Sequence, residues 1–298
     1  MPVTHSPLRY PGGKTSIYSM ISKVIDENNL SNHRYVEPYA GGGGLALALL
    51  FNEKVKEIHL NDLDRSIWSI WHCILNETES FCKKILETEV TIDEWFVQRA
   101  IQEKKHDADL LDLAYSSFFL NRTNRSGIIL KAGVIGGLLQ KSKYPLDCRF
   151  NKDDLVSKIK RIATHRKKIF IYNEDAEAFM KAMDKRKGST LFFIDPPYFE
   201  KGASLYTNAY NENDHEKISK TIKKLKSDWI LTYDNHHKIK EIYSSENIFE
   251  FNLNYSAATK RVGTEVIVFS GAINTPEDLM NVKLLEVNKS LISFETKN

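Results

Sequence analysis

The chain is poor in cysteine and contains no long apolar run. Its three cysteines, Cys73, Cys82 and Cys148, form no CxxC pair, and any disulfide scheme leaves one of them unpaired. No stretch reaches the roughly 18 apolar residues that a membrane span needs. The N-terminus also has neither the basic nor the apolar region of a signal peptide. These absences predict a protein of the reducing cytoplasm with no role in a membrane.

Charge is abundant but unevenly distributed. The 298 residues are 42% hydrophobic, 27% charged and 11% aromatic, which is typical of a globular protein and excludes a disordered or collagen-like chain. The net charge is only +3, yet residues 118–168 contain thirteen Lys and Arg and three Asp. That segment therefore predicts a surface for a polyanion on an otherwise acidic body. A solvated helix face is the alternative interpretation for residues 158–168 alone.

Alternating helices and strands predict one α/β core of the doubly wound, nucleotide-binding type. Helical spacing of apolar residues occurs at 16–28, and short helices are expected at 66–75 and 175–183. Apolar, β-branched and aromatic runs predict strands at residues 35–37, 57–60, 168–172, 191–194, 229–233 and 265–269.

The middle of the chain interrupts this rhythm. Amphipathic helices are expected at about residues 79–86, 92–104 and 110–120, before a basic, glycine-punctuated stretch at 121–150. We therefore divide the chain into a catalytic core (residues 1–75 and 160–273), an insertion (residues 76–159) and a tail (residues 274–298). The sequence does not indicate what the tail does.

Four consecutive glycines, residues 41–44, stand between an expected strand and an expected helix and are called the glycine turn. Gly41, Gly43 and Ala46 fit the pattern G-x-G-x-x-A, and Asp62 follows at the end of the next strand, 21 residues after Gly41. A carboxylate there can accept hydrogen bonds from ribose hydroxyls. The turn thus predicts an adenosine-containing cofactor, without distinguishing NAD from S-adenosylmethionine, and a merely flexible loop is the alternative.

Two other patterns carry little weight. Residues 11–15 end like a phosphate-binding P-loop, but Leu8 stands where that motif requires glycine, which argues against an NTPase. His236 and His237 are adjacent, but no cysteine or acidic residue at ligand spacing accompanies them. We expect a surface loop there and no metal.

The most specific motif is Asp195-Pro196-Pro197-Tyr198, called the catalytic turn here, which follows the apolar strand expected at 191–194. The two prolines fix φ and leave carbonyls without backbone donors. Asp195 and a proline carbonyl can together accept both hydrogens of an exocyclic amine, while the Tyr198 ring stacks on the base. A rigid surface turn is the alternative.

Such a pair of acceptors suits the N6 amine of adenine. Its lone pair is delocalised into the ring, so the free amine is a poor nucleophile. Two acceptors draw it toward tetrahedral geometry, from which it can attack a sulfonium methyl in line. Positioning and preorganised charge suffice, and the reaction needs neither a metal nor a covalent intermediate.

Together these motifs resemble the Dam-like DNA adenine-N6 methyltransferases, which use S-adenosylmethionine. Four blocks carry the likeness in the family's order: residues 7–14 (PLRYPGGK), 36–44 (VEPYAGGGG), 61–62 (ND) and 195–198 (DPPY). Weaker likenesses at 118–122 (FFLNR) and 149–152 (RFNK) match the start and end of the family's target-recognition region. The resemblance implies a Rossmann-like methyltransferase sheet with a mainly helical, basic target-recognition insertion.

The resemblance also implies roles for single residues. The cofactor-binding residues would be Tyr10, Lys14, Glu37, Gly41, Gly43, Asp62, Asp175 and Asp195, with Glu174 as an alternative to Asp175. The catalytic residues that grip the target adenine would be Asp195, Pro196, Pro197 and Tyr198. Tyr10 stands where some members have Trp, and residues 121–127 differ from better-known members. No recognition sequence is therefore carried over.

Double-stranded DNA is the expected partner, bound by a monomer or a weak dimer. Its N6 amines lie in the base stack, so the adenine must be flipped out. Arg9 is a candidate DNA contact, and base edges could be read by Asn121, Arg122, Asn124 and Arg125. Candidate phosphate contacts are Lys131, Lys141, Lys143, Lys152, Lys260 and Arg261.

Three other functions were weighed. An N4-cytosine methyltransferase more often has Ser where this motif has Asp195. A nicotinamide-dependent oxidoreductase would explain the glycine turn and Asp62, but neither the catalytic turn nor the basic insertion. A catalytically idle DNA-binding protein would not need the intact motif. We therefore expect a site-specific DNA adenine-N6 methyltransferase, whose recognition sequence and biological setting the sequence does not reveal.

Overall fold

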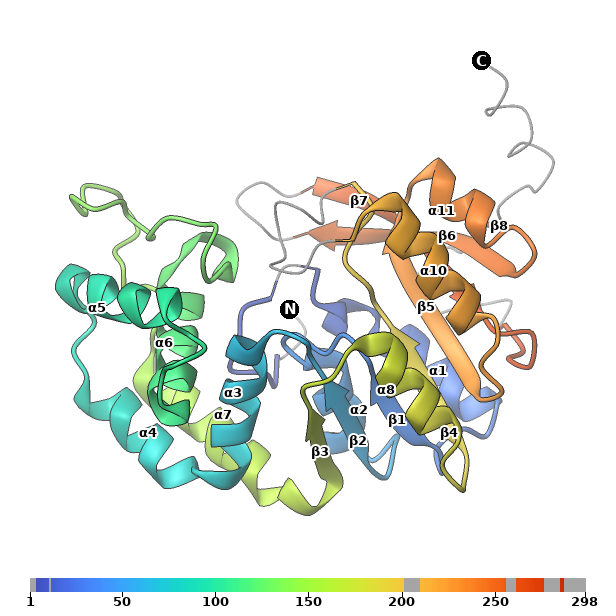
Figure 1. Cartoon of the computed structure of the whole chain (residues 1–298), viewed down its shortest axis with the longest axis horizontal. Helices are drawn as coiled ribbons and strands as arrows, with labels where there is room; N and C mark the ends of the chain where they lie inside the picture. The colour runs from blue at the N-terminus through green and yellow to red at the C-terminus, as the bar shows by residue number, and fades with distance from the viewer. Residues whose placement is uncertain (1–3, 11, 201–209, 256–260, 276–284, 287–298) are drawn as a thin grey trace.

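The computed structural model describes residues 4–10, 12–200, 210–255, 261–275 and 285–286 (Figure 1). Its centre is a sheet in the order β3-β2-β1-β4-β5-β7-β6-β8. The strands are β1 Arg34–Glu37, β2 Ile58–Asn61, β3 Ile169–Tyr172, β4 Thr190–Ile194, β5 Asp228–Asp234, β6 Asn247–Tyr255, β7 Arg261–Phe269 and β8 Leu285–Glu286.

Strand direction determines where a ligand can bind. Strands β3, β2, β1, β4 and β5 are parallel, whereas β7 runs antiparallel to both β5 and β6. The order reverses between β1 and β4, because β2 and β3 extend the sheet one way from β1 and β4 and β5 the other way. In doubly wound sheets this switch point opens a crevice at the carboxyl ends of the strands.

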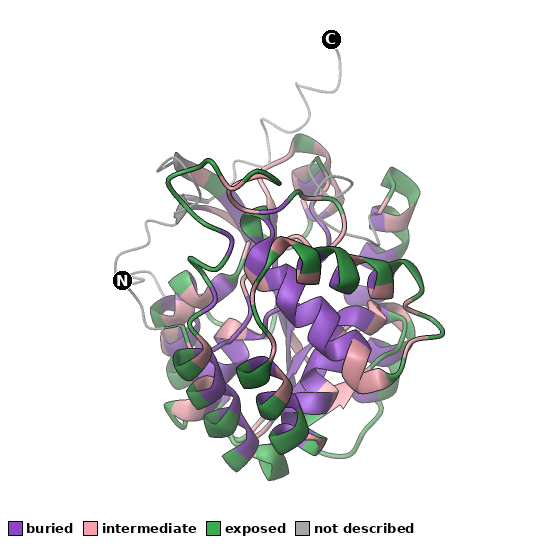
Figure 2. Ribbon diagram, turned by 90° about the vertical axis from the view of Figure 1, so that its left-hand side faces the viewer, coloured by how far each residue is buried: buried purple, intermediate pink, exposed green. Residues whose placement is uncertain are grey.

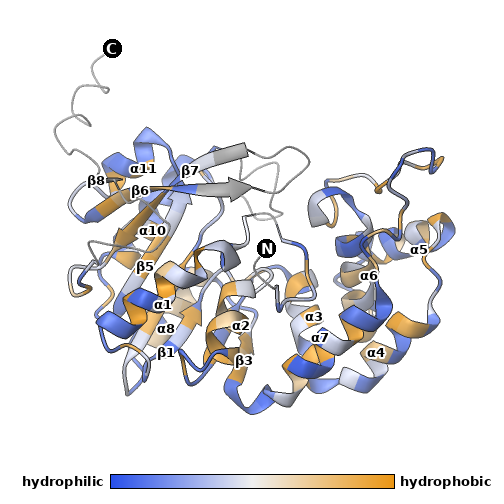
Figure 3. Cartoon of the chain, turned by 180° about the vertical axis from the view of Figure 1, so that it is seen from behind, coloured by the Kyte–Doolittle hydropathy of each residue, from blue (hydrophilic) through white to orange (hydrophobic). Residues whose placement is uncertain are grey.

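Helices cover both faces of the sheet. On one face, α1 (Tyr18–Glu27), α2 (Gly44–Phe51) and α3 (Arg65–Asn76) pack with side chains such as Tyr35 and Phe193. On the other face, α8 (Ala176–Asp184), α10 (Glu212–Ile222) and α11 (His237–Ile242) pack with Val36 and Phe192. Successive strand residues therefore point to opposite faces. Figure 3 shows the resulting hydrophobic colour on α2 and the central strands.

The insertion forms a helical unit at one end of the sheet (Figure 1). Its helices are α4 (Thr78–Glu87), α5 (Ile92–Glu103) and α6 (Leu110–Thr123), and α7 (Lys152–Thr164) leads back to β3. Helix α6 is buried along most of its length, as Figure 2 shows from this side of the molecule. The expected boundary between residues 159 and 160 lies inside α7.

The Rossmann-like, doubly wound fold is confirmed, and all six expected strands are present. The sequence did not lead us to β6, β8, α10 or α11, so the antiparallel side of the sheet is larger than expected. Among the described residues, no helix is both long enough and apolar enough to cross a membrane.

Candidate active site

The glycine turn lies between two aromatic rings at the carboxyl end of β1. Gly41 and Gly43 adopt left-handed conformations, with φ of +46° and +55°. A Cβ on Gly41 would lie 2.5 Å from Cε1 of Tyr10, and one on Gly43 would lie 2.8 Å from Cζ2 of Trp71. The indole of Trp71 also donates to the Gly41 carbonyl at 3.0 Å. Only glycine satisfies both the backbone conformation and this packing.

Asp62 follows β2 and lies against the glycine turn. Its Oδ2 accepts the Gly41 N–H at 3.0 Å, and its Oδ1 accepts the Asp64 N–H at 2.9 Å. Burial, followed by the charge of Asp64, raises the pKa of Asp62 to about 7. Each carboxylate oxygen keeps lone-pair capacity for a further donor such as a ribose hydroxyl. The carboxylate therefore joins the two segments that sequence analysis assigned to a cofactor.

Glu37 ends β1 and is buried beside the same turn. The Tyr35 hydroxyl donates to its Oε1 at 3.0 Å, and a backbone N–H at Ala46 in α2 also stabilises its charged form. Burial outweighs both bonds and raises the pKa of Glu37 to about 8. This carboxyl group is therefore protonated in a large fraction of molecules at neutral pH.

Asn61 fastens the carboxyl ends of β1, β2 and β3 together. Its side-chain amide donates to the carbonyls of Pro38 and Glu174, and its Oδ1 accepts the Glu174 N–H at 2.9 Å. Asp175 comes next and caps α8, with Oδ1 accepting the Ala178 N–H at 3.0 Å. Asp175 is exposed at the edge that holds Asp62, which suits the predicted contact with a cofactor but does not test it.

The catalytic turn follows β4, next to β1 at the switch point. Lys14, at the start of η1 (Lys14–Ile17), places its Nζ 2.9 Å from Asp195 Oδ1 and 3.1 Å from the Tyr198 hydroxyl. The same ammonium donates to the Gly12 carbonyl at 3.0 Å. Lys14 was expected to border the cofactor, and the structure shows that its ammonium is bonded to the catalytic turn.

Asp195 is charged only above mildly acidic pH. Burial raises its pKa to about 6, with Lys14 lowering the value and Glu265 raising it. Thr232 on β5 donates to Asp195 Oδ1 at 2.8 Å, which also favours the charged form. Its side chain is 20% exposed, so the carboxylate can still meet a ligand.

Three residues of this site were missed in the sequence, and all lie on β5 or β7. They are Thr232, Asp234, which accepts the N–H groups of Phe199 and Glu200, and Glu265, which accepts the Tyr198 hydroxyl at 2.6 Å. No motif contains them. Their only signal was a polar side chain within or next to an apolar strand segment.

Asn121 does not have the exposed, base-reading position expected for it. The side chain is fully buried in α6. Its Oδ1 accepts the Arg9 N–H at 2.8 Å, and its amide donates to the carbonyls of Arg9 and Gly127 at 2.7 and 2.9 Å. The predicted role is wrong, because these backbone bonds occupy the polar atoms that would have faced a base.

The base-reading role expected for Asn124 is wrong for the same reason. Its Oδ1 accepts the Trp95 indole N–H at 2.7 Å, and its amide donates to the carbonyls of Ile128 and Ile129. The Arg9 guanidinium donates to the Asn124 carbonyl at 2.9 Å. Burial is the main cause that lowers the pKa of Arg9. These residues build the junction between the N-terminal segment and the insertion.

Arg122 and Lys152 also bind backbone carbonyls. Arg122 donates to Arg149 at 2.6 Å, and burial, reinforced by the charge of Arg9, lowers the Arg122 pKa to about 10. Lys152 donates to the carbonyls of Leu86 and Thr88, which joins the start of α7 to the end of α4. Lys152 therefore makes a structural contact in addition to the phosphate contact predicted for it.

The remaining DNA-binding predictions divide by exposure. Arg125, Lys131, Lys141 and Lys143 are exposed on the insertion. Leu138, Leu139 and Tyr144, three of the most exposed large apolar residues, lie on the same loop. Lys260 lies outside the described residues, and only the backbone of Arg261, in β7, is described. The insertion thus presents a mixed basic and apolar loop.

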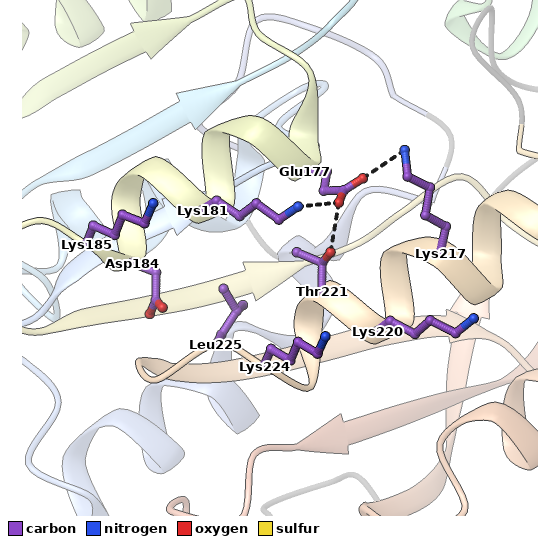
Figure 4. A pocket seen from close by; sticks show the side chains of 9 residues that line it. All are labelled: Glu177, Lys181, Asp184, Lys185, Lys217, Lys220, Thr221, Lys224 and Leu225. Carbon is purple, nitrogen blue, oxygen red and sulfur yellow. Dashed lines mark hydrogen bonds and ion pairs between the residues drawn. The ribbon is translucent and has the colours of Figure 1, made fainter.

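A separate hollow of about 330 Å³ lies between α8 and α10 (Figure 4). Two of its lysines, Lys181 and Lys217, bind Glu177 and, with the Thr221 hydroxyl, lower the pKa of that carboxyl to about 2. Five lysines line it: Lys181, Lys185, Lys217, Lys220 and Lys224. The core therefore also carries a local lysine-rich surface, outside the basic segment at residues 118–168.

The adjacent histidines have a structural place. His236 caps α11 by accepting the Lys238 N–H, and its ring stacks on Phe199 with centroids 4.3 Å apart. Within the described ranges, no group of three or more His, Cys, Asp or Glu side chains is arranged to hold a metal ion.

Comparison with known proteins places this arrangement in a family. Residues 10–257 match the family of D12 class N6 adenine-specific DNA methyltransferases. The chain belongs to this family. It is therefore a DNA adenine methyltransferase, as the catalytic turn and the glycine turn led us to expect.

Individual relatives are more distant from this methyltransferase. The Type II methyltransferase M.MjaIII of Methanocaldococcus jannaschii is 25% identical over 239 residues, which cover 73% of this chain and 79% of the relative. A Listeria monocytogenes protein described as a class I S-adenosylmethionine-dependent methyltransferase has a TM-score of 0.38 at 10% identity, covering 89% of this chain and 63% of its own. The rRNA methyltransferase AviRa of Streptomyces viridochromogenes has a TM-score of 0.33 at 10% identity, covering 85% and 84%.

Proposed function

We propose that this enzyme transfers a methyl group from S-adenosylmethionine to N6 of an adenine that has been flipped out of duplex DNA within a short recognition sequence. The observation that carries the proposal is the switch point between β1 and β4. It brings the glycine turn and Asp62 to the same edge of the sheet as Asp195. A methyl donor and an amine acceptor could therefore meet there.

The residues around the glycine turn fit this cofactor. Gly41 and Gly43 keep side chains away from the turn, and Asp62 offers carboxylate lone pairs to ribose hydroxyls. Glu37 and Tyr10 border the turn, and Asp175 lies at the end of the neighbouring strand. When bound, S-adenosylmethionine supplies an electrophilic methyl group on a sulfonium. The chain's own residues have to orient the amine toward it.

Asp195 and the Pro196 carbonyl are the proposed acceptors for the amine hydrogens. Lys14 and Thr232 both bind Oδ1 of Asp195, which leaves Oδ2 for an N–H of the target base. A carboxylate that accepts this hydrogen increases electron density on nitrogen as the new N–C bond forms. The same carboxylate can take up the proton that the methylated amine releases.

Tyr198 would stack on the flipped adenine. Its ring is held by Lys14 and Glu265 and is only 6% exposed, so neighbouring groups must move aside when a base arrives. Unstacking the base costs a few kcal/mol, which phosphate contacts and aromatic stacking offset. Exposed Arg125, Lys131, Lys141 and Lys143 on the insertion are the proposed DNA contacts. Residues 76–159 would thus read the target while the core performs the transfer, in the cytoplasm of a prokaryotic cell.

The decisive experiment is sequencing with base-modification detection of DNA from cells that express this chain in a strain lacking adenine methylation. N6-methyladenine at one recurrent short motif is expected, and none with the Asp195→Ala variant. Methylation of cytosine N4 instead, or wild-type activity of Asp195→Ala, would contradict the proposal. Soluble wild-type protein without any modified base in duplex DNA would contradict it as well.

A further inference from the structure

Glu265 is a buried carboxylate at the catalytic turn that belongs to none of the motifs discussed so far. It lies on β7 opposite Asp234 of β5, and it is 1% exposed. Its Oε1 accepts the Tyr198 hydroxyl at 2.6 Å, and its Oε2 lies 3.4 Å from Lys14 Nζ. A carboxylate in such a position is costly unless it is paired and hydrogen-bonded. The hydrogen bond and the ion pair both offset the cost of its burial.

The side-chain contacts of Glu265 do not hold the strands of the sheet together. Strands β5 and β7 are joined by backbone hydrogen bonds, to which the Glu265 side chain contributes nothing. An apolar side chain of similar volume could fill the same space without the desolvation cost. Two of the partners of Glu265 are Tyr198 of the catalytic turn and Lys14 of the N-terminal motif.

Glu265 fixes the ring on which the target base is proposed to stack. Tyr198 is restrained at one end by the backbone after Pro197 and at the other by its hydroxyl, which is bonded to Glu265 and lies 3.1 Å from Lys14 Nζ. The Lys14 ammonium is also 5.2 Å from the centroid of the Tyr198 ring. A base that stacks on this ring takes its plane, and therefore its amine direction, from these contacts.

Glu265 also shares the ammonium that neutralises Asp195. Lys14 lies 2.9 Å from Asp195 Oδ1 and 3.4 Å from Glu265 Oε2, so its charge is divided between two carboxylates. Asp195 thereby keeps more of its negative charge for the amine than it would in an exclusive ion pair.

We propose that Glu265 is a positioning residue for methyl transfer, which acts through Tyr198 and Lys14 and does not touch the substrate. This inference rests on the proposed function of the catalytic turn. It predicts that Glu265 contributes to the transfer step and contributes little to the affinity for DNA or cofactor.

The charge of Glu265 should be visible in the pH profile. The ionisable groups around this cluster are Lys14 from η1, Asp195 and Tyr198 from the catalytic turn, Tyr35 and Glu37 from β1, and Tyr233 and Asp234 from β5. Glu265 raises the pKa of Asp195, and Lys14 lowers it. Removing the charge at position 265 should therefore lower that pKa and move the acidic limb of the transfer rate to lower pH.

The test is single-turnover methylation by Glu265→Gln and Glu265→Ala at saturating cofactor and DNA. Glutamine keeps an acceptor for the Tyr198 hydroxyl but loses the charge, and alanine loses both. We expect the transfer rate to fall about tenfold for Gln and about a hundredfold for Ala. The KM values should stay within about twofold, because substrate contacts are unchanged.

The matched control is Glu250→Gln on the neighbouring strand β6. Glu250 pairs with Lys240 at 2.6 Å and belongs to neither functional turn. The same substitution there should leave the transfer rate and its pH profile unchanged. A second probe is Tyr198→Phe, which keeps the ring and removes the hydroxyl that Glu265 holds. It should reproduce the part of the loss that Glu265→Ala shows beyond Glu265→Gln, and combining it with Glu265→Ala should add little, because both changes remove the same hydrogen bond.

Three results would overturn the proposal. One is a wild-type transfer rate in folded Glu265→Ala, and another is a loss confined to KM. If the Glu265 variants do not fold, a wild-type rate in Tyr198→Phe would count equally against it. These outcomes presuppose that the wild-type enzyme methylates adenine, so they are distinct from failure of the proposed function, in which the wild-type enzyme itself would be inactive.

Discussion

Arg9 and Asn121 are joined by a reciprocal pair of hydrogen bonds. The Arg9 N–H donates to Asn121 Oδ1 at 2.8 Å, and the Asn121 amide donates back to the Arg9 carbonyl at 2.7 Å. The Asn121 side chain therefore bonds both backbone groups of Arg9, as a neighbouring β-strand would, although the two residues are 112 positions apart in sequence. The pair attaches the N-terminal motif to the longest buried helix of the insertion.

Asn121→Ala should destabilise the protein without altering sequence preference. The change removes three hydrogen bonds of a buried side chain and leaves backbone groups of Arg9 and Gly127 without these partners. We expect the free energy of unfolding to fall by about 2–4 kcal/mol, measured by urea unfolding. At a temperature where the variant is folded, its methylated motif should match that of the wild type. A changed motif would restore a base-reading role for Asn121.

Gly41→Ala should abolish cofactor binding. An alanine there would have to adopt φ of +46° and overlap the Tyr10 ring, so the turn must move away from Asp62. Calorimetric titration with S-adenosylmethionine should show a loss of affinity of at least about a hundredfold. The control is Gly271→Ala, because a Cβ on Gly271 meets nothing within 4 Å. Wild-type affinity in Gly41→Ala would place the cofactor elsewhere.

Asp62 and Glu37 should each lower the stability of the protein as the pH rises from about 4 to about 8. Folding raises the pKa of Asp62 from 3.8 to about 7 and that of Glu37 from 4.5 to about 8. At these two carboxyl groups the folded state binds more protons than the unfolded state, so their contribution to the free energy of unfolding decreases with pH. Thermal unfolding across this range would measure the slope. Glu37→Gln should flatten it, and an unchanged slope would mean that Glu37 is ionised in the folded protein.

Arg125 and Lys141 should differ in their effects on DNA binding. Both are exposed on the insertion, but only the planar guanidinium can form paired bonds to a guanine edge. Arg125→Ala should relax the preference for the methylated motif. Lys141→Ala should weaken all duplexes alike and reduce the salt slope by about one. Equal losses on specific and random duplexes in both variants would refute a reading role for Arg125.

Much of the fold could be predicted because its signals are local. The apolar runs at 191–194 and 265–269 and the glycine turn each reveal a strand or a strand-to-helix connection by themselves. Strand β6 was missed although residues 249–255 alternate strictly between apolar and polar side chains, a local strand signal that the sequence analysis overlooked; only its pairing with β7 depends on contacts distant in sequence. The order of the antiparallel strands likewise depends on contacts far apart in sequence.

The site was predictable only where a motif carries it. Asp195 and Asp62 stand in recognisable patterns, whereas Glu265 became visible only when β7 brought it to Tyr198. The opposite error occurred at Asn121 and Asn124. Their side chains have the hydrogen-bond donors and acceptors that can read bases. Because the side chains are buried, their amide groups donate to backbone carbonyls instead. Residue type indicates what a side chain can bind, and packing decides what it meets.

The short stretch from Arg9 to Lys14 has a consequence for engineering. Arg9 is bonded to the insertion and Lys14 to the catalytic turn, so six residues of chain connect the two halves of the enzyme. If only the insertion is transplanted from a relative with another target, the residues that contact Arg9 are replaced while Arg9 itself is not. Chimeras designed to change specificity should therefore exchange residues 4–10 together with residues 76–159. Both partners of the Arg9–Asn121 contact then come from the same protein.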